Sequence, residues 1–444
     1  LGLALRSTAP GGPPPLEDVI YMLPWMRDAS PFDKGSVLFR TPDRRPWPYQ
    51  PGSSQQDTFI DIVYAPPGKG KSVFLNTTNL AFCLSPMATS GSGGAQLPRV
   101  AIIDIGPSSS GLISLLKEAL PPERRHEVEY RRLRMIREHA INPFDTQLGC
   151  RKPLPLERAF LVNFITMLAT EQGERAPAGL SQLAGMAVDE LYERFSDRSK
   201  RGNPRPYTEG EDAAVDEALR RYDIDLGPEP TWWECVDKLF RRGARREAAL
   251  AQRHAVPRVE DLMVIRSPQI MDVYGTARTQ QGEPLVDVFQ RTVSGALREY
   301  PILTMPTRFD LGEARVVSLD LDEAAPRGGG PADKQTAIVY MLARFTLARD
   351  FYLNEEILPL VPEDYRKFHE ARIRRIRETP KRIVFDEFHR TKSTPVIREQ
   401  VKVDMREGRK WGVQVALASQ LLEDFDEDMI SLATGFWIMG VNTE

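Results

Sequence analysis

The sequence predicts an α/β protein in which a mostly parallel sheet is covered by helices on both faces and interrupted by a large helical block. Short apolar runs rich in β-branched residues occur in both halves of the chain and are typical of buried strands. Helical patterns separate these runs, as in sheets whose strands are joined by helical crossovers. Between the two halves, residues 151–300 hold helical patterns with few strand-like runs.

The elements of the first half follow one another in a clear order. Residues 36–41 (SVLFRT) and 58–64 (TFIDIVY) have the β-branched and aromatic content of strands. Residues 73–84 place apolar side chains at helical spacing, and 99–105 (RVAIIDI) form another buried-strand run. Residues 111–120 then predict a helix.

Strand patterns return in the second half of the chain. Strands are expected at 314–321, 382–385, 413–418 and 436–441, with helices between them at 334–351, 364–378 and 394–410. The chain therefore divides into an extended N-terminal linker (1–34), a first part of the core (35–150), a mostly helical insertion (151–300) and a second part of the core (301–444). The linker assignment depends on proline and glycine near the N-terminus, which favour an extended chain.

Composition limits the classes of protein that remain. The chain has 444 residues, enough for two or three domains, and a hydrophobic fraction of 41 %, which is too high for a disordered chain. Its net charge of −3 argues against a globally basic nucleic-acid binder but leaves a local basic groove open. Three distant cysteines argue against a disulfide scaffold and favour a reducing compartment. Because the chain begins with Leu1 and ends directly after an apolar run, we expect it to be a piece of a longer protein.

A phosphate-binding loop is predicted after the strand at 58–64. Residues 65–72 (APPGKGKS) match the pattern G-x-x-x-x-G-K-[ST], with alanine in place of the first glycine. In such a loop, backbone N–H groups point at phosphate oxygens, the lysine lies across the β- and γ-phosphates, and the final hydroxyl ligates Mg²⁺. We assign nucleotide binding to Pro67, Gly68, Lys69, Gly70, Lys71, Ser72 and Val73, and place Ser72 on the metal as well. A glycine-rich turn with a chance Lys-Ser pair is the alternative.

A pair of adjacent acids ends the strand expected at 382–385. A nucleotide hydrolase needs one carboxylate near Mg²⁺ and another that orients the attacking water. We assign Asp386 to the metal and Glu387 as the general base. Apolar runs that end in Asp-Glu are common at strand exits, so the assignment depends on the phosphate loop. The two motifs lie 315 residues apart and must face the same triphosphate, with Lys71 and Glu387 in one cleft.

Further polar residues follow the Asp-Glu pair. Gln420 stands at the tip of the next strand and is expected to sense the γ-phosphate or the attacking water. Arg409 or Arg406 is a candidate arginine finger for a neighbouring subunit's nucleotide, the alternative being a solvated basic helix end. His389 either touches the site or is a simple loop histidine. Three basic runs either meet acidic partners or nucleic acid, or are solvated helix faces: 131–137, 241–246 and 372–377.

With these residues in hand, the chain resembles the ATPase domain of the VirB-type conjugation and secretion ATPases, and most closely their type IVB branch, the DotO/IcmB and TraU-like proteins. The stretches that support the resemblance are 35–72, 99–120, 141–150, 383–390 and 407–420. Among them, IIDIGPSSSG is far more specific than the phosphate loop itself. The resemblance covers most of the chain from about residue 20 onward, and the helical block is its least distinctive part.

The resemblance implies a RecA-like core with a helical insertion and the use of ATP with Mg²⁺. It also implies homo-oligomers, as hexamers or hexamers of dimers, that contact other ATPases and inner-membrane components of a secretion apparatus. The expected location is cytoplasmic, at the face of the bacterial inner membrane. DNA is a possible partner that the resemblance does not require.

We therefore expect an ATP-hydrolysing motor that energises a type IVB secretion or conjugation system. The first alternative is a DNA-translocating motor of the coupling-protein or FtsK/HerA kind, against which the near-neutral charge speaks. The second is a scaffold that binds nucleotide without hydrolysing it, which the intact Asp386-Glu387 pair disfavours.

Overall fold

A seven-stranded sheet forms the centre of the molecule. The computed structural model describes residues 12–22, 30–41, 44–53, 56, 58–85, 96–171, 173–392 and 394–440. Within these residues the strand order is β5-β6-β4-β7-β8-β3-β9, and all neighbouring strands are parallel. The strands are β3 (Ile60–Tyr64), β4 (Arg99–Asp104), β5 (Val128–Arg132), β6 (Val316–Asp320), β7 (Lys381–Phe385), β8 (Val413–Ser419) and β9 (Gly435–Ile438). The carboxyl ends of all seven therefore lie at one edge of the sheet, and the predicted α/β class is confirmed.

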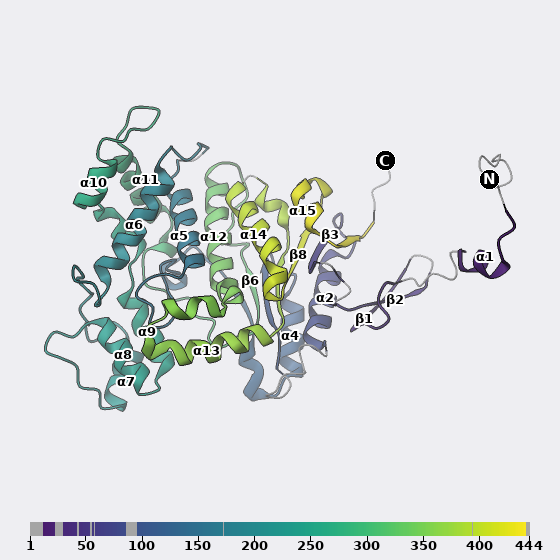
Figure 1. Ribbon diagram of the computed structural model, residues 1–444, viewed down its shortest axis with the longest axis horizontal. Helices are drawn as coiled ribbons and strands as arrows, with labels where there is room; N and C mark the ends of the chain where they lie inside the picture. Colours follow the sequence, from purple (N-terminus) through teal and green to yellow (C-terminus); the bar gives the residue numbers. More distant parts are fainter. Residues whose placement is uncertain are drawn as a thin grey trace.

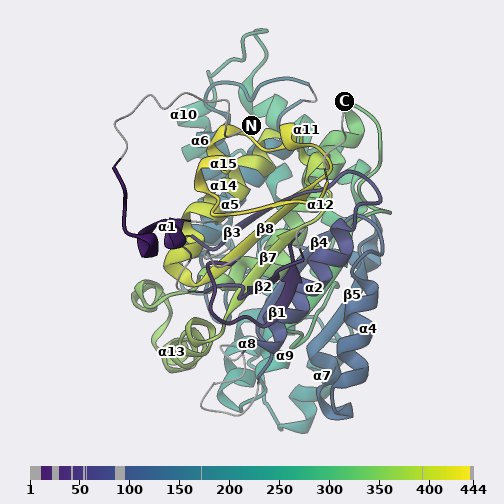
Figure 2. The same cartoon turned by 90° about the vertical axis from the view of Figure 1, so that its right-hand side faces the viewer.

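Helices cover both faces of the sheet, as predicted. On one side lie α2 (Lys71–Leu84) and α4 (Ser110–Ala119), and on the other lie α12 (Pro331–Ala348) and α14 (Pro395–Trp411) (Figures 1 and 2). The strands alternate their side chains between two cores. In β4, for example, Val100 and Ile102 pack with α2 and α4, whereas Ala101 and Ile103 pack in the core that contains α12 and α14.

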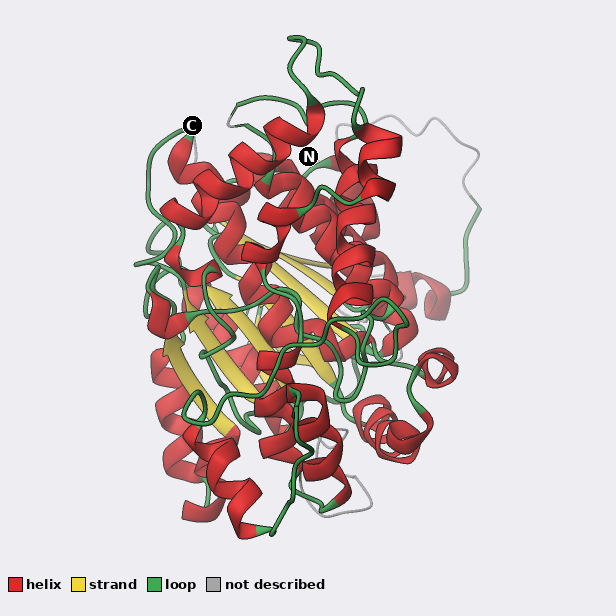
Figure 3. Cartoon of the chain, turned by 90° about the vertical axis from the view of Figure 1, so that its left-hand side faces the viewer, coloured by secondary structure: helices red, strands yellow, loops and turns green. Residues whose placement is uncertain are grey.

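The large helical block lies beyond α12 and α14, on one side of the sheet (Figures 1 and 3). Its helices are α5 (Pro155–Leu168), α6 (Leu180–Phe195), α7 (Ala213–Arg221), α8 (Trp232–Arg241), α9 (Arg245–Ala255), α10 (Pro268–Tyr274) and α11 (Leu285–Glu299). The chain enters this block after β5 and returns to β6, which are neighbours at one end of the sheet. A later helix, α13 (Glu363–Glu378), joins the block, because its Tyr365 and Ile373 share a core with α7, α8 and α9.

The remaining elements lie near β3 and β9, at one end of the sheet. A hairpin of β1 (Val37–Arg40) and β2 (Pro46–Tyr49) packs its aromatic side chains against Trp437 of β9 and Phe74 of α2. The short helix α15 (Glu427–Leu432) connects β8 to β9. Among the described residues, no helix is both long and apolar enough to cross a membrane.

The structure differs from the sequence predictions at several elements, α15 among them. The strands β2 and β5 were not expected, since prolines interrupt one and charges fill the other. The short helix α1 (Leu16–Met22) lies within the segment expected to be an extended linker, much of which falls outside the described residues. The strand expected at 436–441 ends earlier, at Ile438, and residue 441 is outside the described residues.

Lys381 at the start of β7 gives the fold a pH dependence. Its amine is buried and donates a hydrogen bond to the Ile376 carbonyl oxygen at 2.8 Å. Burial, together with the positive charges of Arg99 and Arg377, lowers the pKa of Lys381 to about 8. Between this value and the ordinary lysine pKa, the unfolded chain keeps a proton that the folded chain has released, so a rise in pH stabilises the fold.

We expect this dependence to disappear in Lys381→Met. Relative to that variant, the free energy of unfolding of the parent protein should rise by up to about 1.4 kcal/mol between pH 8 and pH 9. Urea titrations of both proteins at each pH measure it, and the comparison removes the titration of all other groups. A difference that stays constant over this range would show that Lys381 keeps its ordinary pKa.

Candidate active site

The loop between β3 and α2 has the backbone that close contact with a phosphate requires. Gly68 (φ 77°) and Gly70 (φ 91°) adopt left-handed conformations that disfavour a side chain. A Cβ atom at Gly68 would meet nothing within 4 Å, so the loop is open on that side. Among the described residues, only Arg44, Asp223 and Glu387 combine a side chain with a positive φ. Ala65 is not one of them, which explains why alanine can replace the first glycine of the pattern.

Lys71 joins the two motifs that the sequence separates. It is the first residue of α2, and its amine lies 2.9 Å from Asp386 Oδ1 and contacts Glu387 Oε1. Burial lowers the pKa of the Lys71 amine, but Asp386 and Glu387 outweigh burial and the pKa ends above its usual value. Lys71 is therefore a fully charged group that faces two carboxylates at the carboxyl edge of the sheet.

Glu387 is held by three side chains that surround its carboxylate. Besides Lys71, Gln420 Nε2 donates a hydrogen bond to Oε2 at 2.9 Å, and His389 Nδ1 lies 3.1 Å from the same oxygen. Burial raises the pKa of Glu387, but His389 and Lys71 outweigh burial and bring the pKa down to about 2. The backbone of Glu387 is left-handed (φ 51°), a conformation that is uncommon for a residue with a side chain and is often found at functional sites.

The strand order explains how Gln420 reaches this site. β8 lies between β3, which leads into the phosphate loop, and β7, which ends at the Asp-Glu pair. Ser419 pairs with Tyr64, so Gln420 is at the level where the loop begins. The chain after it is anchored, because the buried carboxylate of Asp424 accepts hydrogen bonds from the Ser419 hydroxyl and from the Leu421 N–H.

Two residues of the site were not assigned from the sequence. Ser108 Oγ donates to Asp104 Oδ2 at 2.6 Å and lies 3.3 Å from Asp386 Oδ2. Burial and the Asp386 charge raise the pKa of Asp104 to about 6, although hydrogen bonds from Ser108 and Ser109 oppose the shift. The available signal was the position of Asp104 at the end of β4, whose neighbour β7 ends at Phe385, directly before Asp386. That adjacency is not visible in the sequence.

The two candidate arginine fingers lie away from the loop between β3 and α2 of their own chain. Arg409 and Arg406 are exposed on the last turns of α14, which precede the start of β8. The phosphate loop lies at the opposite end of the strands, roughly 20 Å away along a seven-residue strand. Arg406 lies 3.9 Å from Asp428. A role for either arginine in a neighbouring subunit stays a prediction.

The residues of the site fit a magnesium nucleotide. The exposed loop Pro67–Lys69 leads into the N-terminus of α2, where unpaired backbone N–H groups favour anions. Within the described residues the half-buried Ser72 hydroxyl makes no hydrogen bond, so it is free to ligate a cation, and Asp386 supplies a nearby carboxylate. Val73 is 70 % exposed on the first turn of α2 and presents an apolar side chain beside the loop.

The strand order and the loop together define an α/β protein with a RecA-like core. No family model matches the chain, and a comparison with curated proteins finds no match. Among solved structures, the chain is similar to VirB4 of Thermoanaerobacter pseudethanolicus, with a TM-score of 0.50 and 14 % sequence identity. The similarity covers 93 % of this chain and 85 % of that one. At this identity it establishes a shared fold that includes the helical block as well as the sheet.

Proposed function

We propose that the chain is an ATP-hydrolysing motor of the VirB type, which energises a type IV secretion or conjugation system of the type IVB branch. The observation that supports the proposal most is the contact between Lys71 and Glu387, two residues 316 positions apart in the sequence. The candidate phosphate-binding lysine follows β3 and the candidate base follows β7, and only one strand, β8, lies between these two strands in the sheet. Both residues therefore meet at the carboxyl edge of the sheet. The fold similarity to VirB4 adds support over nearly the whole chain.

In this proposal, each side chain has a separate task. Lys71 leaves the carboxylates and binds the β- and γ-phosphates of ATP, while the loop Gly68–Gly70 approaches the phosphates with its backbone. Ser72 and Asp386 would hold Mg²⁺, which would neutralise charge on the phosphates. Glu387 accepts a proton from the attacking water, and Gln420 positions that water or the γ-phosphate. Asp104 and Ser108 fix the orientation of Asp386.

The test of the proposal is nucleotide binding and turnover in Lys71→Ala. We expect at least a tenfold loss in the affinity for Mg-ATP, measured by calorimetry, and a loss of phosphate release, because the loop loses its cation. Lys117→Ala removes a lysine from the exposed side of α4 and should change neither quantity. Equal affinity and turnover in Lys71→Ala and the parent protein would overturn the proposal.

The assembly and location are part of the same proposal. We place the chain as a homo-oligomer, hexamers or hexamers of dimers, at the cytoplasmic face of the bacterial inner membrane, in contact with other components of the secretion apparatus. DNA is not required for this role. Turnover that DNA stimulates, and that falls steeply with added salt, would instead favour a DNA-translocating motor.

A further inference from the structure

A row of cations crosses the amino edge of the sheet, opposite to the edge that holds the candidate active site. Arg99 begins β4 and pairs with Lys381, the first residue of β7. Arg315 directly precedes β6, whose Val316 pairs with Val100. Neighbouring strands lie roughly 5 Å apart, so these three cations stand side by side on the adjacent strands β6, β4 and β7.

The three cations face the same side of the sheet, where α13 adds a fourth. Alternate residues of a strand share a face. Residues at even spacing after the cations all pack in the core that contains α12 and α14: Ala101, Leu319 and Ile383. On this side Arg315 Nη2 approaches the Thr379 hydroxyl at 3.5 Å, and that hydroxyl donates to the Arg375 carbonyl oxygen at 2.7 Å. We call Arg99, Arg315, Arg375 and Lys381 the amino-edge cluster.

The amino-edge cluster has only neutral partners at close range. In the part of the chain that the structure describes, none of its four side chains takes part in an ion pair within 4.0 Å. Lys381 and Arg315 donate hydrogen bonds to backbone carbonyl oxygens at 2.8 and 2.7 Å. The side chains of Arg99 and Arg375 make no hydrogen bond with any described residue.

The pKa values of the cluster also indicate positive charge that is poorly balanced. Burial lowers the pKa of Arg99, and nearby arginines add to this effect, although Asp350 and Glu313 oppose it. Burial and the charge of Arg99 lower the pKa of Arg315, although Glu127 opposes the shift. Since arginine stays charged in proteins, these groups repel one another within the folded chain. An anion from solution would relieve this repulsion.

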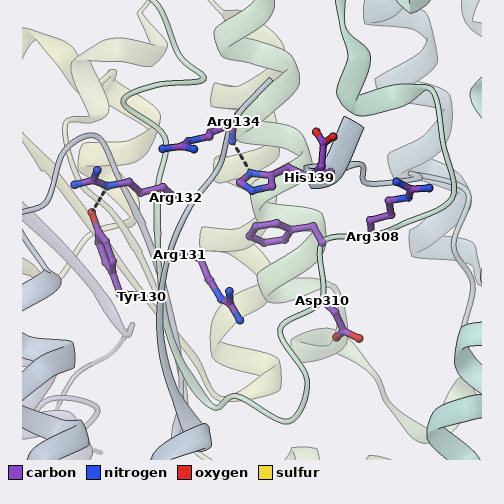
Figure 4. A pocket seen from close by; sticks show the side chains of 9 residues that line it. Tyr130, Arg131, Arg132, Arg134, His139, Arg308 and Asp310 are labelled. Carbon is purple, nitrogen blue, oxygen red and sulfur yellow. Dashed lines mark hydrogen bonds between the residues drawn. The ribbon is translucent and has the colours of Figure 1, made fainter. Parts of the chain in front are cut away.

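The arginines at the carboxyl end of β5 are better compensated. Figure 4 shows Arg131, Arg132, Arg134 and Arg308 around a pocket of about 650 Å³. Carboxylate oxygens of the chain lie 3.6 Å from Arg131, 3.5 Å from Arg132 and 2.8 Å from Arg134. Of the two groups of cations, the amino-edge cluster is therefore the one that favours an external anion.

We propose that the amino-edge cluster binds a phosphate group. A phosphate monoester carries a charge of about −1.5 to −2 at neutral pH, more than one carboxylate, and guanidinium groups bind its oxygens through paired N–H bonds. Arg99 and Arg315 are half-buried and Arg375 is exposed, so solvent reaches the cluster. The phosphate belongs either to a nucleotide or to free phosphate. Because the cluster and the phosphate loop lie at opposite edges of the sheet, this site does not depend on the proposed function.

Calorimetric titration of the 444-residue chain with inorganic pyrophosphate tests the site. We expect Lys71→Ala, which weakens the phosphate loop, to keep a pyrophosphate site. Adding Arg99→Gln and Arg375→Gln to that variant should weaken the remaining binding at least tenfold. The matched control adds Arg242→Gln and Arg366→Gln instead. These two arginines are exposed and have no ion pair within the described residues, so binding should stay unchanged.

Parallel titrations with inorganic phosphate and with AMP distinguish the two sources of the phosphate group. Tighter binding of AMP identifies a nucleotide, and equal or weaker binding identifies free phosphate. A tetraglutamate peptide that bound as tightly as pyrophosphate would overturn the proposal, because it would assign the cluster to carboxylates.

Other results separate this proposal from the proposed function. If Lys71→Ala alone abolished pyrophosphate binding, the loop after β3 would be the only phosphate site, which would overturn the present proposal and leave the proposed function intact. Equal binding by the site variant and its control would also overturn it. Melting temperatures in phosphate-free buffer give a second readout. Because its arginines repel one another, the site variant should melt no lower than its control, and a lower value would show that these arginines stabilise the fold instead.

Discussion

Replacing Glu387 by Gln should lower ATP turnover by about 100- to 10,000-fold and leave ATP binding close to the parent value. The glutamine keeps the size of the side chain but cannot accept a proton from water. In the structure Gln420 and His389 lie against the Glu387 carboxylate. The pKa of Glu387, about 2, keeps this carboxylate ionised. In the proposed mechanism Lys71 turns to a phosphate, so that one of the cations that lower this pKa is lost and the carboxylate becomes a stronger base.

The measurement is the rate of phosphate release at saturating Mg-ATP, together with the dissociation constant for a non-hydrolysable analogue. Glu118→Gln, which changes an exposed glutamate on α4 in the same way, should match the parent in both. If the Glu387→Gln variant turned over ATP at a rate close to that of the parent, Glu387 would not be the base. If the variant lost binding of the ATP analogue rather than turnover, Glu387 would serve to hold the site in shape rather than act as the base. Since hydrolysis can require assembly, both proteins should be compared at the same oligomeric state.

Replacing Asp61 by Ala should lower the free energy of unfolding by about 3–5 kcal/mol, because it leaves a buried arginine without its carboxylate. Asp61 is the second residue of β3 and is 5 % exposed. Its Oδ2 accepts a hydrogen bond from the Tyr49 hydroxyl at 2.9 Å and lies 3.6 Å from Arg382, whose side chain is 1 % exposed. Trp437 Nε1 approaches Oδ1 at 3.3 Å. One carboxylate thus connects β3 to the β1–β2 hairpin, to β7 and to β9.

Urea denaturation of the variant and the parent measures the effect. A matched control is Glu355→Ala, which removes the carboxylate from the exposed pair with Arg377 and should cost less than about 1 kcal/mol. The double variant Asp61→Leu with Arg382→Met removes both charges and should recover part of the loss. A loss in Asp61→Ala no larger than that in Glu355→Ala would show that solvent reaches the pair.

The sequence predicts the strands of the sheet well wherever burial on both faces makes them apolar. Runs such as RVAIIDI and VQVALA are buried along nearly their whole length, so their composition reveals them. β5 was not predicted because it is the outermost strand of the sheet. In it, Arg131 and Arg132 are exposed and Glu129 is half-buried. Its sequence pattern is that of a charged surface, and only pairing with β6 identifies it as a strand.

The candidate site was predictable where a local motif defines it. Lys71, Asp386, Glu387 and Gln420 each stand at the end of a recognisable strand or loop, and the structure brings them together. Their roles in catalysis remain predictions. Asp104 and Ser108 escaped assignment because their importance comes from strand order, a property of the folded chain. His389 had two interpretations, and its contact with Glu387 favours the one at the site.

The path of the chain between β5 and β6 has a consequence for how such proteins diversify. A crossover between neighbouring parallel strands needs only about a dozen residues. Most of the residues between β5 and β6 are therefore not needed to connect these two strands. Both of its attachment points lie at the end of the sheet farthest from β3. Mutations can therefore accumulate, and whole helices be gained or lost, in that segment while the loop after β3 and the Asp386-Glu387 pair keep their places.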